Sequence, residues 1–321
     1  MMKTKKNKLK IMISAYALVF IVLFVIIYVV PRVSNIFVET YTAQYGILEQ
    51  STESSYIAVR TERLYTSDNG GQVKRAVSQG ALMRRNANIA DVGAVRYYSQ
   101  ERGIISYYYD GLESVFTPQN MQALTESNLD LNDKDKSYEL KECESGNAQS
   151  GSPIFKVVDN TQWYIVCWVN ADEADDWTPG KSVTVEFDKD DKIKMKVSQC
   201  NMQGEKLQLI LSCNRYYEKF DRIRTGECRL IKASRSGIII DSESITEKDG
   251  TTGVYVMSKK LDEATFVPVK ILLSDGEKTV VEKNYFMDEN GEKVTTIENY
   301  DEILKKPKDS EKKKGSEKNV D

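Results

Sequence analysis

The sequence predicts a mainly β chain that follows one N-terminal transmembrane helix. Residues 11–30 carry no charge, and as a helix they are long enough to cross a bilayer. After residue 40, short runs of β-branched and aromatic residues recur between Gly, Asp and Asn, and helical patterns are scarce. Strands at this spacing, without long helices between them, indicate a sandwich or barrel rather than a parallel sheet.

The first element is a membrane anchor that runs from Ile11 to Val30. Five lysines precede it within residues 1–10, and the positive-inside rule places this basic stub in the cytoplasm and residues 31–321 outside. A cleaved signal peptide is the alternative, but its apolar part spans about 7–15 residues and ends in a small-x-small site. The run here is longer and continues through Pro31 and Arg32 without such a site. We therefore expect a single-pass protein of the cell membrane.

Composition limits the chemistry of the part outside the membrane. The five N-terminal lysines and the tail of residues 305–321, with net charge +3, leave −11 for residues 31–304 out of a total of −3. An acidic domain argues against nucleic acid as a partner. Histidine is absent, which removes the Ser-His-Asp and Cys-His systems and most catalytic zinc sites. The five cysteines form no C-x-x-C motif and are Cys143, Cys167, Cys200, Cys213 and Cys228. We therefore predict no catalytic residue, no cofactor and no metal site.

The predicted strands follow one another along the chain. Asp249-Gly250 and Asp275-Gly276 are hairpin-turn signals. The single predicted helix covers residues 118–128 and opens at Thr117-Pro118, and the charged stretch 130–144 after it reads as a linker. The tail 305–321 is rich in Lys, Glu and Ser and is predicted to be disordered. The strand-like runs are residues 56–59, 103–109, 154–158, 163–169, 182–187, 206–211, 254–257 and 267–272.

The order of these segments resembles the HlyD-like membrane fusion proteins, the adaptor subunits of bacterial export systems. Residues 41–49 are similar to the family's opening strand. Residues 66–92 and 103–121 resemble the two halves of its lipoyl-like module. Residues 152–169 and 179–187 are similar to strands of its β-barrel, and residues 236–276 resemble its membrane-proximal domain.

This resemblance implies a division into domains. It also implies that several glycines serve as structural turn residues: Gly71, Gly80, Gly103, Gly111, Gly180 and Gly253. The implied parts are a cytoplasmic stub 1–10, the anchor 11–30, a lipoyl-like β module 31–118, a short helix and charged linker 119–149, a β-barrel 150–228, a membrane-proximal β domain 229–304 and the tail 305–321.

The chain departs from the family pattern in two places. Arg84-Arg85-Asn86 stands where the first lipoyl-like half usually has a third glycine. Members that reach an outer-membrane channel insert a long helical hairpin between the halves, but here only residues 93–102 join them, about 15 Å even if helical. The resemblance is therefore to a Gram-positive type without a long helical hairpin, in a cell with one membrane.

The resemblance implies a non-catalytic adaptor whose partner is a membrane transporter, of the permease or ABC type, or another envelope complex. Family members often form rings, so a homo-oligomer is compatible with it. A cell-envelope or division scaffold with the same fold is the alternative. An anchored hydrolase would need a Ser-Lys dyad, and Ser310 and Lys313 fit that motif only within the predicted disordered tail. A pair of carboxylates, as in a glycosidase, stays open because 48 acidic residues are present.

Overall fold

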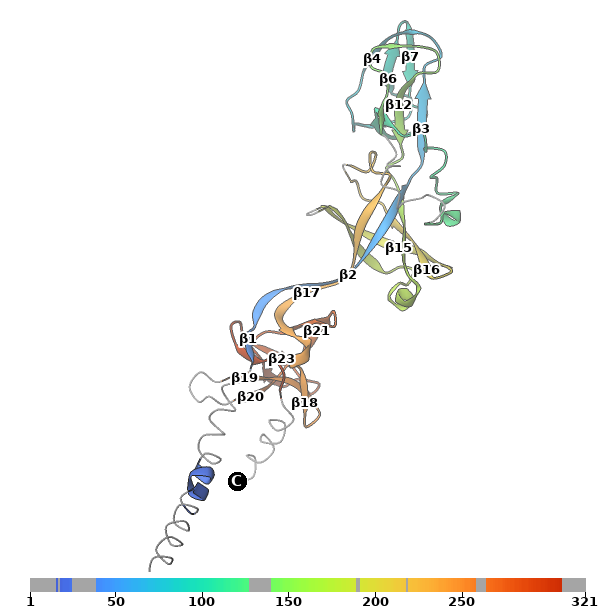
Figure 1. Ribbon diagram of the computed structural model, residues 1–321. Coiled ribbons are helices and arrows are strands. Elements are labelled where there is room, and N and C mark those ends of the chain that lie inside the picture. The colour runs from blue at the N-terminus through green and yellow to red at the C-terminus, as the bar shows by residue number, and fades with distance from the viewer. Residues whose placement is uncertain are drawn as a thin grey trace, which may run out of the picture. The chain divides into compact units, whose positions relative to one another are not determined.

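A computed structural model describes residues 16, 18–24, 39–126, 140–188, 191–217, 219–257 and 264–307 of the chain (Figure 1). Residues 16 and 18–24 are helical, and their large apolar side chains are exposed. Among the described residues, no helix combines the length and the apolar character needed to cross a membrane. The rest of the predicted anchor, the stub 1–10 and residues 308–321 of the tail lie outside the described residues.

The chain divides into two compact units, one of residues 1–50 with 234–321 and one of residues 51–233. Two long strands, β2 (Gln44–Val59) and β17 (Thr225–Asp241), contribute residues to both units. The predicted lipoyl-like module includes residues 40–50, and this assignment is wrong. They belong with the C-terminal part because β1 (Thr40–Thr42) pairs with β25 (Glu302–Leu304).

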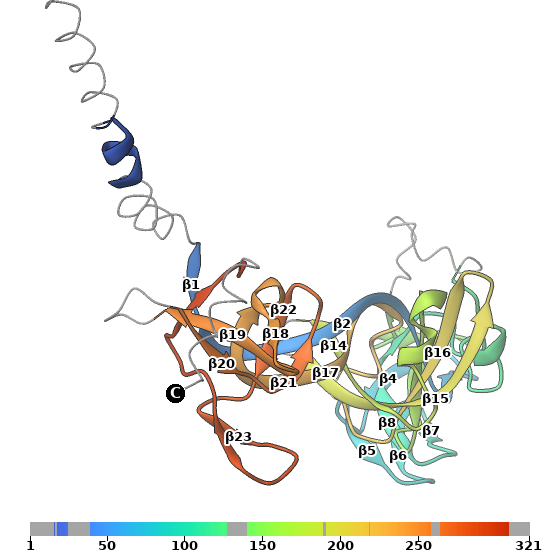
Figure 2. The ribbon, with the colours of Figure 1, turned by 90° about the horizontal axis from the view of Figure 1, so that it is seen from below.

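Residues 51–233 contain a barrel of six described strands whose order closes because β14 pairs with both β15 and β17. Along β15, residues 193, 195 and 197 are buried and residues 192, 194 and 196 are exposed, which is the two-residue period of a strand with one wet face. Figure 2 shows β15 beside β16. The six strands are β2, β13 (Trp163–Asn170), β14 (Ser182–Asp188), β15 (Asp191–Gln203), β16 (Lys206–Cys213) and β17, and the short 3-10 helix η6 (Ala171–Asp176) links β13 to β14.

Strand β13 is buried on both faces because a loop covers the outside of the barrel. Its residues 163, 165, 167 and 169 belong to the barrel core, while residues 166 and 168 form a second cluster with Phe116 and Met121. The sequence predicted a helix over residues 118–128, but the described part, to residue 126, holds only the 3-10 turn η3 (Met121–Ala123). The buried Gln208 amide donates to the Leu124 carbonyl at 2.6 Å and the Met121 carbonyl at 3.2 Å. The barrel thus satisfies carbonyls that a helix would have bonded internally.

Two small sheets face each other in the second domain of this unit, and their inner faces share one apolar core. One sheet has the order β11-β4-β6-β7 and the other β3-β12-β8-β5, with β9 paired to β10 beside them. Figure 1 shows β3 and β12 side by side next to β4, β6 and β7. The strands are β3 (Glu62–Thr66), β4 (Gly71–Arg75), β5 (Leu82–Met83), β6 (Asn88–Val92), β7 (Val95–Tyr98), β8 (Gly103–Ser106), β9 (Tyr108–Tyr109), β10 (Lys141–Glu142), β11 (Asn147–Ala148) and β12 (Pro153–Val158).

Strand β12 corrects the predicted boundary between the first two domains. The predicted lipoyl-like module ends at residue 118, and the predicted barrel includes residues 150–158. In the structure β12 pairs with β3 on one side and β8 on the other, so the module continues to residue 158. These pairings join residues far apart in sequence, and so no local pattern could have shown them. Residues 93–102, predicted to be a short join, contain β7, which forms a hairpin with β6.

The other unit is also built from antiparallel strands around its own apolar core. Its five-stranded sheet has the order β1-β25-β19-β18, with β20 on β19, and a separate hairpin joins β23 to β24. Figure 2 shows β18, β19 and β20 together. The predicted turns Asp249-Gly250 and Asp275-Gly276 join β18 to β19 and β21 to β22. The elements are η7 (Ser242–Ser244), β18 (Thr246–Lys248), β19 (Thr251–Met257), β20 (Ala264–Pro268), β21 (Ile271–Ser274), β22 (Lys278–Val281), β23 (Tyr285–Met287) and β24 (Lys293–Thr295).

Candidate functional site

Three of the six predicted turn glycines adopt backbone angles that disfavour other residues. Gly80, Gly111 and Gly180 have φ of +79°, +80° and +91°. Gly180 follows Pro179, and the Lys181 N–H donates to the Thr178 carbonyl at 3.1 Å. This is the arrangement of a turn with proline and then glycine at its centre, directly before β14.

The other three predicted glycines lie where backbone or side-chain atoms approach closely. A Cβ atom on Gly71 would lie 2.9 Å from the Gly93 nitrogen, one on Gly103 would lie 2.5 Å from the Val158 carbonyl oxygen, and one on Gly253 would lie 2.6 Å from the Val267 carbonyl oxygen. All six positions shape the backbone and carry no reactive group.

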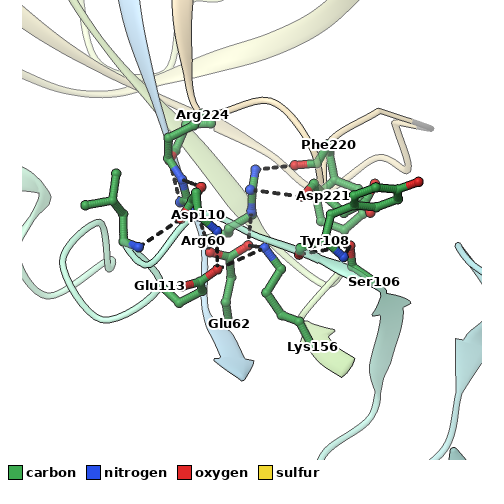
Figure 3. Close-up of polar contacts among 12 residues, drawn as sticks. Arg60, Glu62, Ser106, Tyr108, Asp110, Glu113, Lys156, Phe220, Asp221 and Arg224 are labelled. Atoms are coloured by element: carbon green, nitrogen blue, oxygen red, sulfur yellow. Dashed lines mark hydrogen bonds and ion pairs between the residues drawn. The ribbon is translucent and has the colours of Figure 1, made fainter. Parts of the chain in front are cut away.

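The most unusual chemistry in the described chain is a cluster of buried charges, shown in Figure 3. We call it the buried ionic cluster. Its side chains are between 0 and 8 % exposed, and they come from four separate stretches of the chain. Burying a charge is costly unless partners compensate it, so each group needs its neighbours. The members are Arg60, Glu62, Asp110, Glu113, Lys156 and Arg224.

Glu62, at the start of β3, lies at the centre of the cluster. Its Oε1 accepts from the Arg60 Nε at 2.5 Å and lies 3.0 Å from the Lys156 Nζ. Its Oε2 accepts from the Arg224 Nη2 at 2.5 Å. One carboxylate thus contacts three cations, which is the charge-assisted bonding that a buried acid requires.

The remaining contacts tie this centre to both domains. The Arg224 guanidinium bonds both oxygens of Asp110, with Nε at 2.6 Å from Oδ2 and Nη2 at 3.2 Å from Oδ1. Lys156 in β12 also lies 3.5 Å from the Glu113 Oε1. Arg60, directly after β2, donates from Nη1 to the carbonyls of Phe220 and Ile223, the second at 2.7 Å. The loop before β17 is therefore held to the start of β3.

Local hydrogen bonds fix the loop that supplies the two outer acids. The Asp110 Oδ1 accepts from the Leu112 N–H at 2.9 Å, and the Glu113 Oε1 accepts from the Asp110 N–H at 3.0 Å. An Asp that bonds the backbone two residues on is a turn-forming arrangement. Hydrogen bonds within the loop thus help to hold the two acids where they contact Arg224 and Lys156.

The cluster is built to hold position and not to react. Burial acts to raise the pKa of Glu62, but the charges of Arg60, Lys156 and Arg224 outweigh it and hold that pKa below its usual value. Three cations and three carboxylates also balance one another, so Glu62 stays ionised and has no proton to donate near neutral pH. No described set of His, Cys, Asp and Glu side chains is arranged to bind a metal ion.

Four of the five cysteines likewise lack the features of a nucleophile. Burial raises the pKa of Cys143 to about 12, and it raises that of Cys167, Cys200 and Cys213 as well. The reactive form of cysteine is the thiolate, which a raised pKa disfavours at neutral pH. None of the five is in a disulfide.

The buried ionic cluster was not predicted from the sequence. One signal for it was present: Lys156 is the only charged residue in the run 153–158, and five of the six residues of that strand are buried. A lysine within a buried strand requires an acid nearby. The sequence does not say which of the 48 acidic residues supplies it.

Each of the two domains within residues 51–233 matches a known protein family. Residues 62–159 match the RND-related barrel-sandwich hybrid domain, and residues 163–234 match the RND-related β-barrel domain. The two matches follow one another and together span more than half of the chain. The chain belongs to the HlyD-like membrane fusion proteins.

Solved structures of several membrane fusion and efflux proteins are similar to this membrane fusion protein at low sequence identity. ZneB from Cupriavidus metallidurans is 11 % identical, with 84 % of this chain and 92 % of ZneB covered and a TM-score of 0.27. MacA from Actinobacillus actinomycetemcomitans is 9 % identical, with 83 % and 99 % covered and a TM-score of 0.33. The membrane fusion protein Spr0693 from Streptococcus pneumoniae R6 is 8 % identical, with 58 % and 98 % covered and a TM-score of 0.29. None of the curated proteins matches the chain.

In this membrane fusion protein, the buried ionic cluster lies where the two matched domains meet. Glu62 and Lys156 belong to the barrel-sandwich hybrid, and Arg224 belongs to the β-barrel. The chain passes between the domains next to this cluster, at residues 60–61 and again at 160–162. The ion pairs of the cluster therefore form a joint between the two matched domains.

The stability that Glu62 contributes is expected to be lost in acid. A carboxyl whose folded pKa lies below its ordinary value of 4.5 stabilises the fold fully above that pH, and less as the pH falls towards the folded pKa. We expect the urea midpoint of the wild-type chain to approach that of Glu62→Gln as the pH is lowered from about 5 to about 3. A difference between the two midpoints that stays constant from about pH 7 to about pH 3 would contradict this.

Proposed function

We propose that this membrane fusion protein is a non-catalytic, extracytoplasmic adaptor for an efflux or export transporter of the permease or ABC type. The observation that carries the proposal is the tandem of matched domains, barrel-sandwich hybrid and then β-barrel, in one chain. Homology to membrane fusion proteins supports an efflux adaptor role. An adaptor works through its surfaces, and the buried ionic cluster joins two of the domains that carry them.

The proposed location is the cell membrane, with the N-terminus in the cytoplasm and the two units outside. The five lysines before residues 11–30 support this orientation through the positive-inside rule. A tether at that point would keep the barrel and the sandwich close to a transporter in the same membrane. We further propose that copies of the chain assemble around the transporter.

Photo-crosslinking in intact cells tests the proposed partner. A photoreactive residue is placed in the full chain at an exposed position of each unit, Met202 in the barrel and Met287 in β23, which are 59 % and 53 % exposed. We expect capture of a transport permease or of an ATP-hydrolysing transport subunit from at least one position. Capture of wall-synthesis or division proteins, with no transport subunit from either position, would contradict the adaptor and favour a scaffold.

A matched pair of anchor variants tests the location. Deleting residues 1–30 is expected to abolish both the crosslink and the transport phenotype. Replacing residues 11–30 with an unrelated transmembrane helix, and keeping the lysines, is expected to restore both. Full function of the deletion variant would contradict the membrane tether.

A further inference from the structure

A polar cavity of about 640 Å³ opens on the outer side of the β-barrel, within residues 161–215. Its size falls in the range typical of small-molecule sites, roughly 300–1,000 Å³. The cavity lies over three neighbouring strands, where Ser182 of β14 is opposite Lys196 of β15, and Lys196 is opposite Ser212 of β16. All the lining residues belong to the described part of the chain, and none of them is Asp or Glu.

Two lysines of β15 line the cavity without a carboxylate partner. Lys194 and Lys196 are exposed on the same face of the strand, about 7 Å apart along it. The residues opposite them on β14 are Thr184 and Ser182, which carry no charge. The next lysine along this face, Lys192, differs because it is opposite Glu186 and lies 3.9 Å from it.

Arg215 adds a third positive charge from the loop after β16. Its backbone is held by the barrel core: the Trp163 Nε1 donates to the Arg215 carbonyl at 3.1 Å, and the Arg215 N–H donates to the Cys213 sulfur at 3.4 Å. Its neighbour Asn214 also lines the cavity. Within the described residues, neither Lys194, Lys196 nor Arg215 lies in an ion pair with an acid.

The acid closest in sequence to a lining residue is Asp159, two residues before Thr161, and its carboxylate already accepts two hydrogen bonds. The Asp159 carboxylate accepts from both the N–H and the hydroxyl of Thr161, each at 2.8 Å, and it does not line the cavity. Uncompensated positive charge is thus concentrated here, although residues 31–304 carry a net charge of −11. Such an arrangement attracts anions to one place on an otherwise acidic surface.

We infer that this cavity binds a small polyanion that carries phosphate groups. Lysine ammonium groups bind phosphate as point charges and an arginine fork binds it through two hydrogen bonds, so the cavity offers both modes. The two lysines are spaced to contact two anionic groups of one ligand, and the hydroxyl and amide groups of Ser182, Ser212 and Asn214 are further donors. A soluble oligophosphate and a lipid headgroup with two phosphodiesters share this chemistry. The inference concerns the barrel alone and does not rest on the adaptor function.

Titration calorimetry on the full chain, purified in a neutral detergent, tests the site. The probes are sodium tripolyphosphate, the headgroup of cardiolipin without its acyl chains, which carries two phosphodiesters, and citrate as a polyanion with carboxylates only. We expect one of the two phosphate probes to bind more tightly than citrate, and binding to weaken as salt is raised. The tighter phosphate probe identifies the source, either a soluble oligophosphate or a lipid headgroup. Equal or tighter binding of citrate, or no binding of either phosphate probe, would overturn the inference.

Matched charge variants separate this site from the general charge of the chain. Lys194→Ala/Lys196→Ala/Arg215→Ala should weaken phosphate binding by about tenfold or more, the equivalent of one charge-assisted hydrogen bond. Lys74→Ala/Arg84→Ala/Arg85→Ala removes the same charge from exposed positions of the sandwich domain and should leave binding unchanged. If the triple alanine variant does not fold, Lys194→Gln/Lys196→Gln takes its place, because glutamine keeps most of the bulk and can still form hydrogen bonds. The same weakening of phosphate binding is expected for it. Equal losses in the cavity and sandwich variants would overturn the inference.

Discussion

Replacing Glu62 with alanine is expected to lower the free energy of unfolding by about 3–5 kcal/mol, the cost of breaking a buried ion pair by removing one partner. The variant leaves Arg60, Lys156 and Arg224 buried without the carboxylate that contacts all three. Those charges lose their compensation while the burial remains, which is why the loss exceeds the energy of the pair itself. Urea unfolding of the purified chain, followed by circular dichroism, measures the effect.

The matched control is Glu101→Ala, which removes the same kind of side chain from an exposed ion pair. Glu101 lies 2.8 Å from Arg63, and its side chain is 46 % exposed. We expect a cost of about 0–1 kcal/mol for that change, because water solvates the partner that is left. If Glu62→Ala and Glu101→Ala shift the midpoint equally, water reaches the buried ionic cluster and the joint is not rigid.

Replacing Trp163 with alanine is expected to cost about 3–5 kcal/mol, the range for removing a large aromatic residue from a core. Trp163 is 1 % exposed, and its ring centroid lies 6.0 Å from that of Tyr217 and 6.1 Å from that of Phe220. The variant opens a cavity in the barrel core and also removes the indole N–H that donates to the Arg215 carbonyl. Phosphate binding should therefore weaken together with stability.

Two variants separate these effects. Trp163→Phe loses the indole donor but keeps an aromatic ring in the core, so it should cost less than Trp163→Ala. Tyr216→Ala removes a neighbouring aromatic ring that is 59 % exposed, and we expect it to lie within about 0.5 kcal/mol of wild type. A loss for Tyr216→Ala as large as that for Trp163→Ala would contradict the placement of Trp163 as a core anchor.

The buried ionic cluster and Trp163 are connected through Phe220. The Phe220 ring packs near Trp163, and its carbonyl accepts from Arg60. Changes at Glu62 and at Trp163 are therefore neighbours in one network, and their effects need not add. The loop that carries Phe220 therefore contacts both the barrel core and the buried ionic cluster.

Local patterns in the sequence were enough for the class of the fold. Runs of alternating or β-branched residues predicted strands at 163–169, 182–187 and 206–211, and the structure contains all three. They could be predicted because the two-residue period of a strand appears in consecutive residues. The structure also contains hairpin turns at Asp249-Gly250 and at Asp275-Gly276, since a tight turn depends on the residues that form it. The anchor over residues 11–30 remains a prediction.

Only the tertiary structure decided where the domains divide and where the charges meet. Strand β12 reads as an apolar run with one lysine, and its place between β3 and β8 depends on pairings about 50 to 90 residues away along the chain. The residues of the buried ionic cluster are spread from 60 to 224. The two lysines of the cavity form a basic site only together with Arg215, which comes from another part of the chain. Electrostatic interaction depends on distance and burial in space, and neither of these is fixed by spacing along the sequence.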